Sequence, residues 1–355
     1  MRKSNMKPIK IAQIGTGHHH AVACWGSLKK NTDCFDAIGI CEPVDEYKDS
    51  TINKRCFHVS RASIGDAKLW ELDELLAMDD LEAVAIEAGK EYSCKYAQMF
   101  ADKGVAVFID KPGSADFNEW EKFVTTMKNK NLPLAVGYMY RWNPLVMEAL
   151  RMAESGELGD IYAVEAQMSV RHDTTLRQWL GRYKGGMMYF LGCHLIDMIC
   201  RFQGFPEEVI PMNTSTGNEG LTTEDYGFAV LRYKNGVSFA KTCGSELNGF
   251  DRRQLVICGT KGTYEIRPWE IHIPGKGQIT RAKLTKLDKH VQWGNGAADI
   301  ESEPYDRYDP MMRYFAAQIR GEVGPMCSYD YEIELMRTLI KACGAKNCTC
   351  GEDYE

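Results

Sequence analysis

The sequence has no excess of positive charge, no long apolar run and no internal repeat, and each absence excludes a class of protein. Its 43 lysines and arginines are outnumbered by 49 aspartates and glutamates, which gives a net charge of −6. An acidic chain lacks the basic surface that binds nucleic acid or an anionic membrane. No apolar run is long enough to cross a bilayer. We therefore expect a cytoplasmic protein with a small-molecule ligand and neither a nucleic-acid nor a membrane partner.

The cysteines have no regular spacing, which argues against a disulfide framework. The chain has 13 of them, an odd number, scattered from Cys24 to Cys350. This pattern suits a reducing compartment, where most cysteines serve as small apolar core residues. Cys348 and Cys350 form a pair in a polar tail beside Cys343, but no further metal ligand stands nearby in the sequence. We expect exposed thiols there and predict no metal site in the chain.

The length and the pattern of apolar residues predict two domains of different construction. A chain of 355 residues exceeds the usual size of one compact core. Up to about Gly137, short apolar runs alternate with amphipathic stretches, which is typical of βαβ units and a parallel sheet covered on both faces. We predict strands at 10–14, 37–41, 83–86, 105–109 and 134–136, and helices at 21–30, 69–78, 92–103 and 118–130. We place the domain boundary between residues 138 and 139.

The second predicted domain, residues 139–355, is α+β, with a mainly antiparallel open sheet and helices on one face. The segment Lys234-Asn235-Gly236 is a hairpin signal between two alternating apolar runs. We predict helices at 145–155, 187–202 and 331–343, and strands ending near 164 and spanning 225–233, 237–242, 253–258 and 262–266. Antiparallel strands with helices on one side describe such a domain.

The stretch Gly15-Thr16-Gly17 follows the first predicted strand and opens into a helix, which is the setting of a dinucleotide-binding turn. The first glycine permits a tight turn, the second admits a pyrophosphate, and the helix start offers free N–H groups. The third glycine position of the pattern is occupied by His20. Glu42 ends the second strand 22 residues further on, where it would bind both ribose hydroxyls and repel a 2′-phosphate. The sequence therefore favours NAD over NADP.

Three consecutive histidines, His18, His19 and His20, follow the glycine turn. Neighbouring helical residues point about a third of a turn apart, so we expect that these three side chains cannot converge on one metal ion as i, i+4 pairs do. We predict that His18 or His19 lines the cofactor cleft and that His20 is a partly packed helix residue. A packing role for all three is an equally good interpretation.

Several motifs, taken in order, resemble the Gfo/Idh/MocA family of NAD(P)-dependent sugar and cyclitol oxidoreductases. They are the glycine turn, Asp110-Lys111-Pro112-Gly113, the segments 137–144 and 185–197, and Gly259-Thr-Lys-Gly262, which together run from about residue 9 to 343. The resemblance implies an N-terminal doubly wound Rossmann domain. In the family the motif corresponding to Asp110-Lys111-Pro112 lies at the cofactor, and its lysine bonds the hydroxyl that is oxidised. Lys111 is therefore identified as the equivalent residue, and a lysine beside the nicotinamide ring could relay a proton.

The resemblance also indicates a histidine that acts as general acid or base, and His194 occupies its position. Asp197 stands three residues later on the same helical face, so its carboxylate could orient the imidazole. Two features depart from the family pattern. Phe190 replaces an aspartate that many relatives use at the substrate, and the loop Glu87-Ala-Gly-Lys-Glu-Tyr-Ser93 replaces the usual Thr-Pro-Asn. Both departures leave open whether the usual substrate contacts are kept.

Further substrate contacts are predicted from position and from residue type. Tyr140, Arg141 and Trp142 follow the last strand of the first domain, where such folds bind substrate, and aromatic rings stack on sugars. His172 lies just before the turn at Gly185 and could cover the site. For all four residues a packing or surface role is an open alternative.

Three functions fit these observations. The first is an NAD-dependent dehydrogenase or reductase that acts on the CH–OH group of a sugar, cyclitol or polyol. The second is a glycoside-cleaving enzyme that uses NAD transiently for oxidation and elimination, which Phe190 and the altered loop suggest. The third is a non-catalytic NAD- or sugar-sensing protein. The resemblance further implies a homodimer or homotetramer that buries the open face of the second domain's sheet.

Overall fold

The structure is a computed structural model that describes residues 7–44, 65, 67–288 and 296–350, and the chain divides into two compact units. The first unit comprises Met1–Gly137 and Tyr308–Ile333, and the second comprises Tyr138–Arg307 and Glu334–Glu355. The segment Tyr308–Ile333 lies beyond the boundary predicted at residue 138, yet it belongs to the first unit. A direct contact explains this, because Asp309 accepts hydrogen bonds from Ser27 Oγ (2.8 Å) and from Asn31 Nδ2 (3.1 Å).

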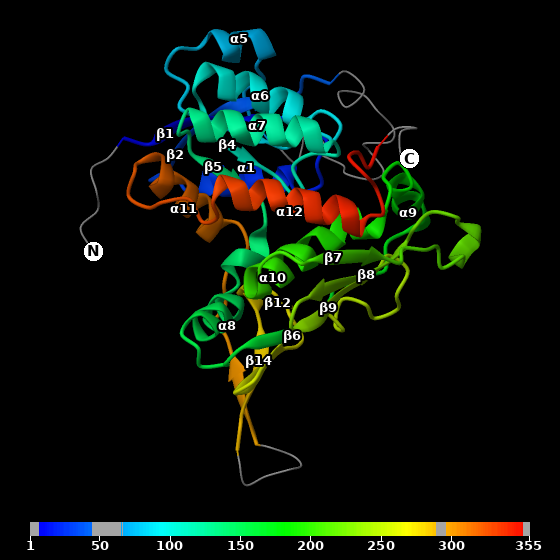
Figure 1. Cartoon of the computed structure of the whole chain (residues 1–355). Coiled ribbons are helices and arrows are strands. Elements are labelled where there is room, and N and C mark those ends of the chain that lie inside the picture. Colours follow the sequence, from blue (N-terminus) through cyan, green and yellow to red (C-terminus); the bar gives the residue numbers. More distant parts are fainter. Residues whose placement is uncertain (1–6, 45–64, 66, 289–295, 351–355) are drawn as a thin grey trace. The chain divides into compact units, whose positions relative to one another are not determined.

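The first unit is built on a five-stranded parallel sheet, as predicted (Figure 1). Its strands are β1 (Ile9–Ile14), β2 (Phe35–Cys41), β3 (Ala83–Ile86), β4 (Ala106–Ile109) and β5 (Leu134–Val136). Their order is β2-β1-β3-β4-β5, so the chain reverses direction across the sheet beside β1. In such a sheet ligands bind outside the carboxyl ends of the strands at this reversal. The segments that follow β1, β3 and β4 are therefore where a site is expected.

The helices of the first unit fall into two groups. They are α1 (Ala21–Lys30), α5 (Leu72–Ala77), α6 (Ser93–Lys103), α7 (Phe117–Asn129) and α11 (Asp309–Ile319). α1 packs beside α11, while α6 packs beside α5 and α7. In α7 the Asp116 carboxylate accepts a hydrogen bond from Glu119 N (3.0 Å), which caps the helix, and apolar residues at helical spacing are buried. The four helices predicted for this region are confirmed within a few residues, and α11 was not predicted.

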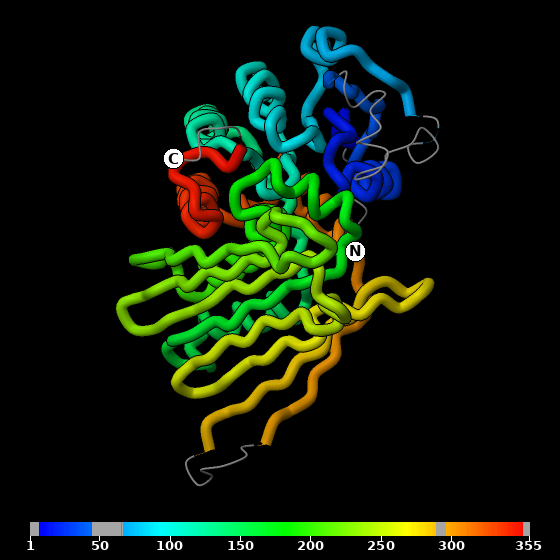
Figure 2. Tube along the Cα trace, turned by 90° about the vertical axis from the view of Figure 1, so that its right-hand side faces the viewer, coloured from blue at the N-terminus to red at the C-terminus, as the bar shows by residue number. Residues whose placement is uncertain are grey.

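The second unit contains an eight-stranded sheet that is antiparallel except for the pair β6 and β9. In spatial order it reads β15 (Ala297–Glu301), β14 (Arg281–Lys286), β11 (Gly262–Ile266), β10 (Gln254–Gly259), β6 (Ile161–Gln167), β9 (Gly236–Cys243), β8 (Tyr226–Tyr233) and β7 (Glu208–Pro211). Figure 2 shows these strands side by side. A two-stranded ribbon of β12 (Ile271–Ile273) and β13 (Gly277–Ile279) accompanies the sheet. The mainly antiparallel sheet and the β8–β9 hairpin at Asn235-Gly236 are confirmed.

Three helices of the second unit, α8 (Pro144–Glu154), η2 (Met188–Gly192) and α10 (Cys193–Gln203), contact that sheet. This unit also contains η1 (Met139–Trp142), α9 (Thr174–Leu180) and η3 (Asn218–Gly220). α10 contacts β6 and β9, and α8 contacts α10 and β11. The helix predicted over 187–202 is interrupted, because η2 is a π-helical turn that precedes the regular turns of α10. α12 (Tyr329–Ala342) begins in the first unit and ends in the second.

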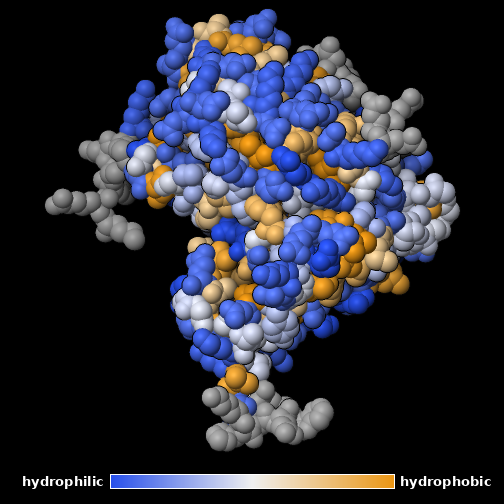
Figure 3. Space-filling model, in the orientation of Figure 1, coloured by the Kyte–Doolittle hydropathy of each residue, from blue (hydrophilic) through white to orange (hydrophobic). Residues whose placement is uncertain are grey.

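The surface hydropathy of the two units and the burial of the cysteines can be compared with the sequence predictions. Hydrophilic side chains cover much of the first unit in the view of Figure 3, while hydrophobic ones gather over β7 and β8 of the second. The exposed residues there include Ile210 and Met212. All twelve cysteines of the described residues are free thiols, and eight are buried. Among the same residues, no helix combines the length and the apolar character that a membrane crossing requires.

Candidate functional site

The glycine turn after β1 is a tight junction between three strands. Gly15 has φ of +89°, and a Cβ atom there would lie 2.6 Å from Ala88 N. Only glycine fits, because both the backbone conformation and the space exclude a side chain. Gly15 N donates to Cys41 O (2.6 Å), and His18 N donates to Glu87 O (2.8 Å). These bonds join the segments after β1, β2 and β3 at the carboxyl edge of the sheet.

Glu42 lies against this turn, as a ribose-binding acid would. Its Oε2 accepts hydrogen bonds from Thr16 N (2.5 Å) and Thr16 Oγ1 (2.6 Å), and its Oε1 accepts one from Val44 N (3.0 Å). The carboxylate is half-buried and fixed from two sides. Gly17 is buried beside it. The predicted cofactor residues Gly15, Thr16, Gly17 and Glu42 are thus neighbours in the structure.

The three histidines converge, contrary to the prediction. Their ring centroids lie 4.3 Å apart for His18 and His19, 4.7 Å for His18 and His20, and 3.8 Å for His19 and His20. The prediction was wrong because it treated the residues as helical. They occupy a turn that precedes α1, which begins at Ala21. In that turn the side chains need not diverge as they do around a helix.

His18 and His20 face two buried carboxylates. His18 Nδ1 lies 3.3 Å from Glu87 Oε2 and 3.5 Å from Asp110 Oδ2, and His20 Nδ1 lies 3.0 Å from Asp110 Oδ2. Burial, reinforced by the positive charge of Lys90, holds the pKa of His18 well below its usual value, so its imidazole is neutral. Burial and the negative charge of Asp110 raise the pKa of Glu87 well above its usual value. Strongly shifted groups that gather in one place are a mark of functional sites.

Lys111, the predicted catalytic lysine, follows β4 and is 1% exposed. Asp110 beside it is fully buried, and the peptide bond between Lys111 and Pro112 is cis. The side chain of Lys90 reaches the same motif, since its Nζ donates to Asp110 O (2.8 Å). The sequence predictions named neither Glu87 nor Lys90 as site residues. Their signal was present, because both are charged and closely follow a buried strand at the carboxyl edge of a parallel sheet.

In the second unit, several predicted residues come together around His194. The His194 ring, 2% exposed, meets the ring of Tyr140 edge-on at 4.8 Å and that of Tyr138 at 5.8 Å. Asp197 Oδ2 and Oδ1 accept hydrogen bonds from Arg141 Nε (2.9 Å) and Nη2 (2.7 Å). Arg141 and Asp197 form a buried bidentate ion pair, in which two parallel hydrogen bonds join the guanidinium to the carboxylate. This is the strongest hydrogen-bonding geometry for these two groups. Arg141 is a partner of Asp197 that the sequence pattern did not suggest.

The hydroxyl of Tyr140 belongs to a second buried network. It donates to Glu270 Oε2 (2.7 Å) and accepts from Arg253 Nη1 (3.0 Å). Arg307 also binds Glu270, through Nε (2.6 Å) and Nη2 (2.8 Å). Burial and the charge of Glu270 raise the pKa of Tyr140. Glu270, Arg253 and Arg307 were not identified from the sequence, because Tyr140 lies more than a hundred residues from both Arg253 and Glu270.

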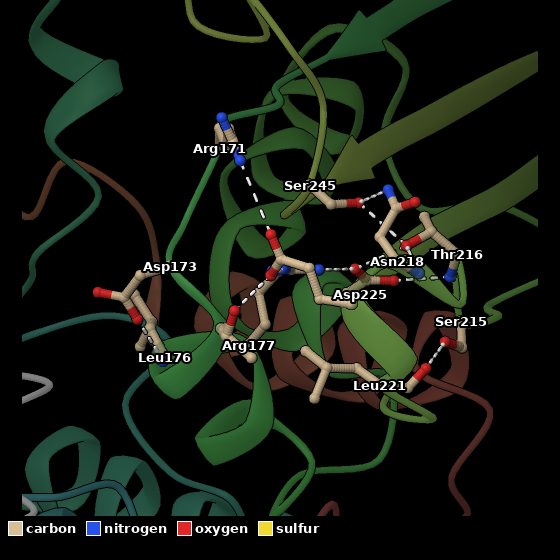
Figure 4. Close-up of polar contacts among 12 residues, drawn as sticks. Arg171, Asp173, Leu176, Arg177, Ser215, Thr216, Asn218, Leu221, Asp225 and Ser245 are labelled. Atoms are coloured by element: carbon tan, nitrogen blue, oxygen red, sulfur yellow. Dashed lines mark hydrogen bonds and ion pairs between the residues drawn. The ribbon is translucent and has the colours of Figure 1, made fainter.

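The remaining predicted substrate residues lie elsewhere in the second unit. The His172 and Phe190 rings meet edge-on at 5.9 Å, and Trp142 is half-buried at the end of η1. A few residues past His172, Arg177 is 2% exposed and pairs with Asp225 (3.0 Å) and with Glu219 (Figure 4). These ion pairs fix α9 against the loop that contains η3. The segment around His172, which was expected either to cover a site or to lie at the surface, is therefore held in place by the ion pairs of the buried Arg177.

Two family models match this chain. Residues 9–138 match an oxidoreductase family with an NAD-binding Rossmann fold, and residues 146–265 match the GFO/IDH/MocA C-terminal domain. An uncharacterized oxidoreductase of Schizosaccharomyces pombe is 27% identical over 73% of this chain and 70% of its own length. The NADP-dependent D-xylose 1-dehydrogenase 2 of Haloferax volcanii is 24% identical, over 75% and 78%. The 2,7-anhydro-N-acetylneuraminate hydratase of Mediterraneibacter gnavus is 22% identical, over 74% and 68%.

Solved structures share the fold over nearly the whole chain. The putative oxidoreductase yvaA of Bacillus subtilis superposes with a TM-score of 0.72 at 18% identity, covering 94% of each chain. The aldose-aldose oxidoreductase of Caulobacter crescentus gives 0.72 at 17% identity, covering 95% of this chain and 97% of the other. At such identities these matches establish the two-domain fold.

Proposed function

The chain belongs to the Gfo/Idh/MocA family of oxidoreductases, and on that premise we propose that it transfers hydride between NAD and a sugar, cyclitol or related polyol. The observation that carries the proposal is the position of Glu42, hydrogen-bonded to Thr16 at the glycine turn. In this fold the pyrophosphate lies at the turn and the acid binds the adenosine ribose. The proximity of Glu42 to the glycine turn supports a dinucleotide site there.

The preference for NAD over NADP is part of the proposal. A carboxylate at the ribose position repels a 2′-phosphate, and the neighbouring Pro43 and Val44 offer no cation to compensate. The D-xylose dehydrogenase relative is named for NADP, so cofactor choice differs among similar chains. For this chain Glu42 favours the unphosphorylated ribose.

The reaction needs a hydride acceptor and a group that takes the hydroxyl proton. Bound NAD supplies the acceptor, and the substrate carbon loses a hydride while its oxygen loses a proton. We assign the proton to Lys111 or His194, both nearly fully buried and both able to exchange a proton. Asp197, held by Arg141, is a positioning residue on the helix that carries His194. Tyr140, Arg141, Trp142, His172 and Phe190 form the proposed substrate contacts.

A second candidate is glycoside cleavage or another elimination with transient use of NAD. Phe190 motivates it, because a phenyl ring that packs on His172 cannot accept a substrate hydrogen bond as an aspartate would. A relative named as a hydratase also differs from a simple dehydrogenase in its net reaction. Product release from a chromogenic glycoside without accumulation of NADH would favour this candidate.

The proposal is tested by calorimetric titration of cofactor-free protein with NAD and with NADP. We expect NAD to bind at least about 10-fold more tightly than NADP, because one lost hydrogen bond to a charged group costs about 1.5–3 kcal/mol. Glu42→Ala should weaken NAD binding by a similar factor and remove the preference. Glu119→Ala, an exposed acid on α7, is the matched control and should behave as wild type. If neither cofactor binds, the NAD-dependent enzyme is excluded and a non-catalytic function is left.

A polyol and sugar panel with NAD then tests the chemistry. Lys111→Met should lower kcat by about 10²-fold to 10⁴-fold, the range for a lost proton-transfer group, while NAD affinity changes little. If no substrate on the panel reduces NAD, hydride transfer with net oxidation is ruled out for those substrates. Turnover unaffected by Lys111→Met would remove Lys111 from the mechanism.

We also propose a homodimer or homotetramer. Three exposed apolar side chains, Ile210, Met212 and Val237, share one face of the eight-stranded sheet, because Ile210 pairs with Val230 and Val237 with Arg232. A gathering of apolar residues on one surface is typical of an interface between subunits. Sedimentation velocity decides the point, and a monomer at micromolar concentration would contradict it.

A further inference from the structure

Three potential metal ligands meet at the carboxyl edge of the first unit's sheet. They are His18 Nδ1, Glu87 Oε2 and Asp110 Oδ2, which follow β1, β3 and β4, three neighbouring strands. His18 Nδ1 lies 3.3 Å from the glutamate oxygen and 3.5 Å from the aspartate oxygen. Both carboxylates are fully buried, and His18 is 6% exposed. The cluster is therefore shielded from water and built from three separate segments.

In this cluster two hydrogen-bond acceptors, His18 Nδ1 and Glu87 Oε2, face one another. His20 N donates to His18 Nδ1 (3.3 Å), so this nitrogen carries a lone pair and no proton. Glu87 Oε2 lies 3.3 Å from it and is also an acceptor when the carboxyl group is ionised. No hydrogen bond of normal distance and angle reaches either oxygen of Glu87, and the Cys24 thiol and Asp110 are the other groups that interact with it. Two acceptors in contact require either a shared proton or a cation between them.

The spacing of the three atoms fits a cation. Zinc is held by imidazole nitrogen and carboxylate oxygen at about 2.0–2.2 Å, so donors around a tetrahedral ion lie about 3.3–3.6 Å apart. The separations of His18 Nδ1 from the two carboxylate oxygens, 3.3 Å and 3.5 Å, fall in this range, and all three atoms lie within 4.8 Å of one another. We propose that His18, Glu87 and Asp110 bind one divalent transition-metal ion, of the class of Zn²⁺ or Co²⁺, and leave one coordination position for water or another ligand. Nitrogen and carboxylate donors together select this class over Mg²⁺ or Ca²⁺.

His20 supports the site by holding Asp110. Its Nδ1 lies 3.0 Å from Asp110 Oδ2 and 3.2 Å from Oδ1, which fixes the carboxylate plane. Partners of this kind commonly change metal affinity about 10–100-fold. Lys90 and Lys111 place positive charge near His18 and Asp110. The repulsion makes binding weaker than at a structural zinc site with thiolate ligands.

Metal binding is tested on full-length protein without a polyhistidine tag, after removal of metal with EDTA. Titration with Co²⁺ is followed by visible absorption, whose bands report a tetrahedral ion, and zinc content is measured by mass spectrometry after dialysis. We expect one ion per chain and a higher melting temperature with Zn²⁺, since a ligand of the folded state stabilises it. No cofactor is present, so the result does not depend on the proposed function.

The key variant is Glu87→Gln. The glutamine amide can donate to His18 Nδ1, which supplies a hydrogen bond at that place but removes the charged ligand. It should weaken Co²⁺ binding at least about 100-fold and abolish the thermal shift, while His20→Ala should weaken binding about 10–100-fold. Asp80→Asn, an exposed acid of the same unit, is the control and should bind as wild type.

Two results would overturn the proposal. Wild-type protein that takes up no Co²⁺ or Zn²⁺ would show that His18 and Glu87 share a proton instead. Binding that survives in folded Glu87→Gln would show that the ion is held by other residues. If the variant fails to fold, as circular dichroism would reveal, the spectrum of wild-type protein with Co²⁺ decides alone, because a histidine–carboxylate tetrahedron and an unbound aqueous ion absorb differently.

Discussion

Glu87 in the first unit and Asp197 in the second are both fully buried acids, yet their surroundings are opposite. Asp197 accepts two hydrogen bonds from Arg141 at 2.7 Å and 2.9 Å. Glu87 accepts no hydrogen bond of normal distance and angle, and the groups close to it are the Cys24 thiol, Asp110 and His18 Nδ1, the last at 3.3 Å. Removing one partner of a paired buried acid leaves an uncompensated charge and is costly, whereas an acid that is already unpaired has no such partner to lose. Asp197 therefore belongs to a structural ion pair with Arg141, whereas Glu87 is available to bind a ligand.

The same contrast extends to the two polar clusters. In the second unit, Tyr140, Glu270, Arg253 and Arg307 form a network in which each charged group has a partner. In the first unit, His18 and Glu87 have pKa values displaced in opposite directions, both chiefly by burial. Fully satisfied networks confer rigidity, and incompletely satisfied ones are found where chemistry or binding occurs. Four substitutions measure this difference.

The largest effect is expected from Asp197→Ala. It leaves Arg141 charged, 4% exposed and without its main partner, which should lower the free energy of unfolding by about 3–5 kcal/mol. Urea denaturation followed by circular dichroism measures the loss. The double variant Arg141→Met with Asp197→Leu should recover most of it, because apolar side chains replace the pair. A loss below about 1 kcal/mol for the single variant would mean that the pair does not stabilise the fold.

Asp225→Asn should lower the free energy of unfolding by about 2–3 kcal/mol at pH 7. Asp225 accepts from Thr216 N (2.7 Å), Thr216 Oγ1 (2.9 Å) and Arg177 Nη1 (3.0 Å), and bonds to a charged group are worth about 1.5–3 kcal/mol each (Figure 4). Burial alone would raise its pKa, but the bonds from Thr216 and Arg177 outweigh it, and the folded-state pKa is lowered.

The lowered pKa fixes the pH dependence. The stabilisation by Asp225 is fully present above the unfolded pKa of about 3.9 and is lost as the pH falls through the lower folded value. The gap between wild type and Asp225→Asn should therefore shrink below about pH 3.9 in denaturation at a series of pH values. Asp173→Asn is the control, because Asn caps a helix as well as Asp. A gap that persists unchanged at low pH would exclude the charge as its cause.

Tyr140→Phe should cost about 1.5 kcal/mol, the lower end for hydrogen bonds to charged groups. The substitution removes the bonds to Glu270 and Arg253 but keeps the ring that packs on His194 at 4.8 Å. Thermal denaturation measures the loss, and the near-ultraviolet circular dichroism spectrum checks that the ring environment is kept. An unchanged melting temperature would show that the two arginines satisfy Glu270 without the hydroxyl.

The smallest effect should come from Glu87→Gln in metal-free protein, with a change below about 1 kcal/mol in either direction. Glu87 is as deeply buried as Asp197, but its substitution removes no hydrogen bond of normal geometry. The new amide can also donate a hydrogen bond to His18. Urea denaturation in EDTA makes the comparison with Asp197→Ala direct. A loss of about 3 kcal/mol or more would place Glu87 among the architectural groups and remove the contrast.

Most regular elements were predictable from the sequence, because they depend on local pattern. The boundaries of β3, β5 and α1 agree with the prediction to the residue. The missed elements had weaker signals. α9 spans only seven residues, and the one local signal for α11 is the proline in its first turn, Asp309-Pro310. The π-helical turn η2 could not be foreseen, because the Met187–Phe202 pattern fits a continuous helix as well.

The candidate site was predictable in part. Glu42 was found from its spacing to the glycine turn, and the structure brings it to Thr16. The functional roles of Lys111, His194 and the other predicted site residues stay predictions that the proposed experiments test. Glu87 and Lys90 were not predicted as site residues, because charged residues in the loop after β3 do not by themselves indicate a contact with His18 or Asp110. The prediction for the histidines failed because these residues precede the first turn of α1, which begins at Ala21.

The sequence by itself determined the features that depend on a few neighbouring residues. They are the alternation of strands and helices that gives a parallel sheet, the hairpin at Asn235-Gly236, and the need for glycine at position 15, where φ is positive and a side chain has no space. Only the tertiary structure decided which charges meet. His18 and Asp110 are 92 positions apart in the chain, and Arg141 and Asp197 are 56 apart. Local propensity contains no information on such pairs, because their distance is set by how strands align in a sheet and how helices pack on it.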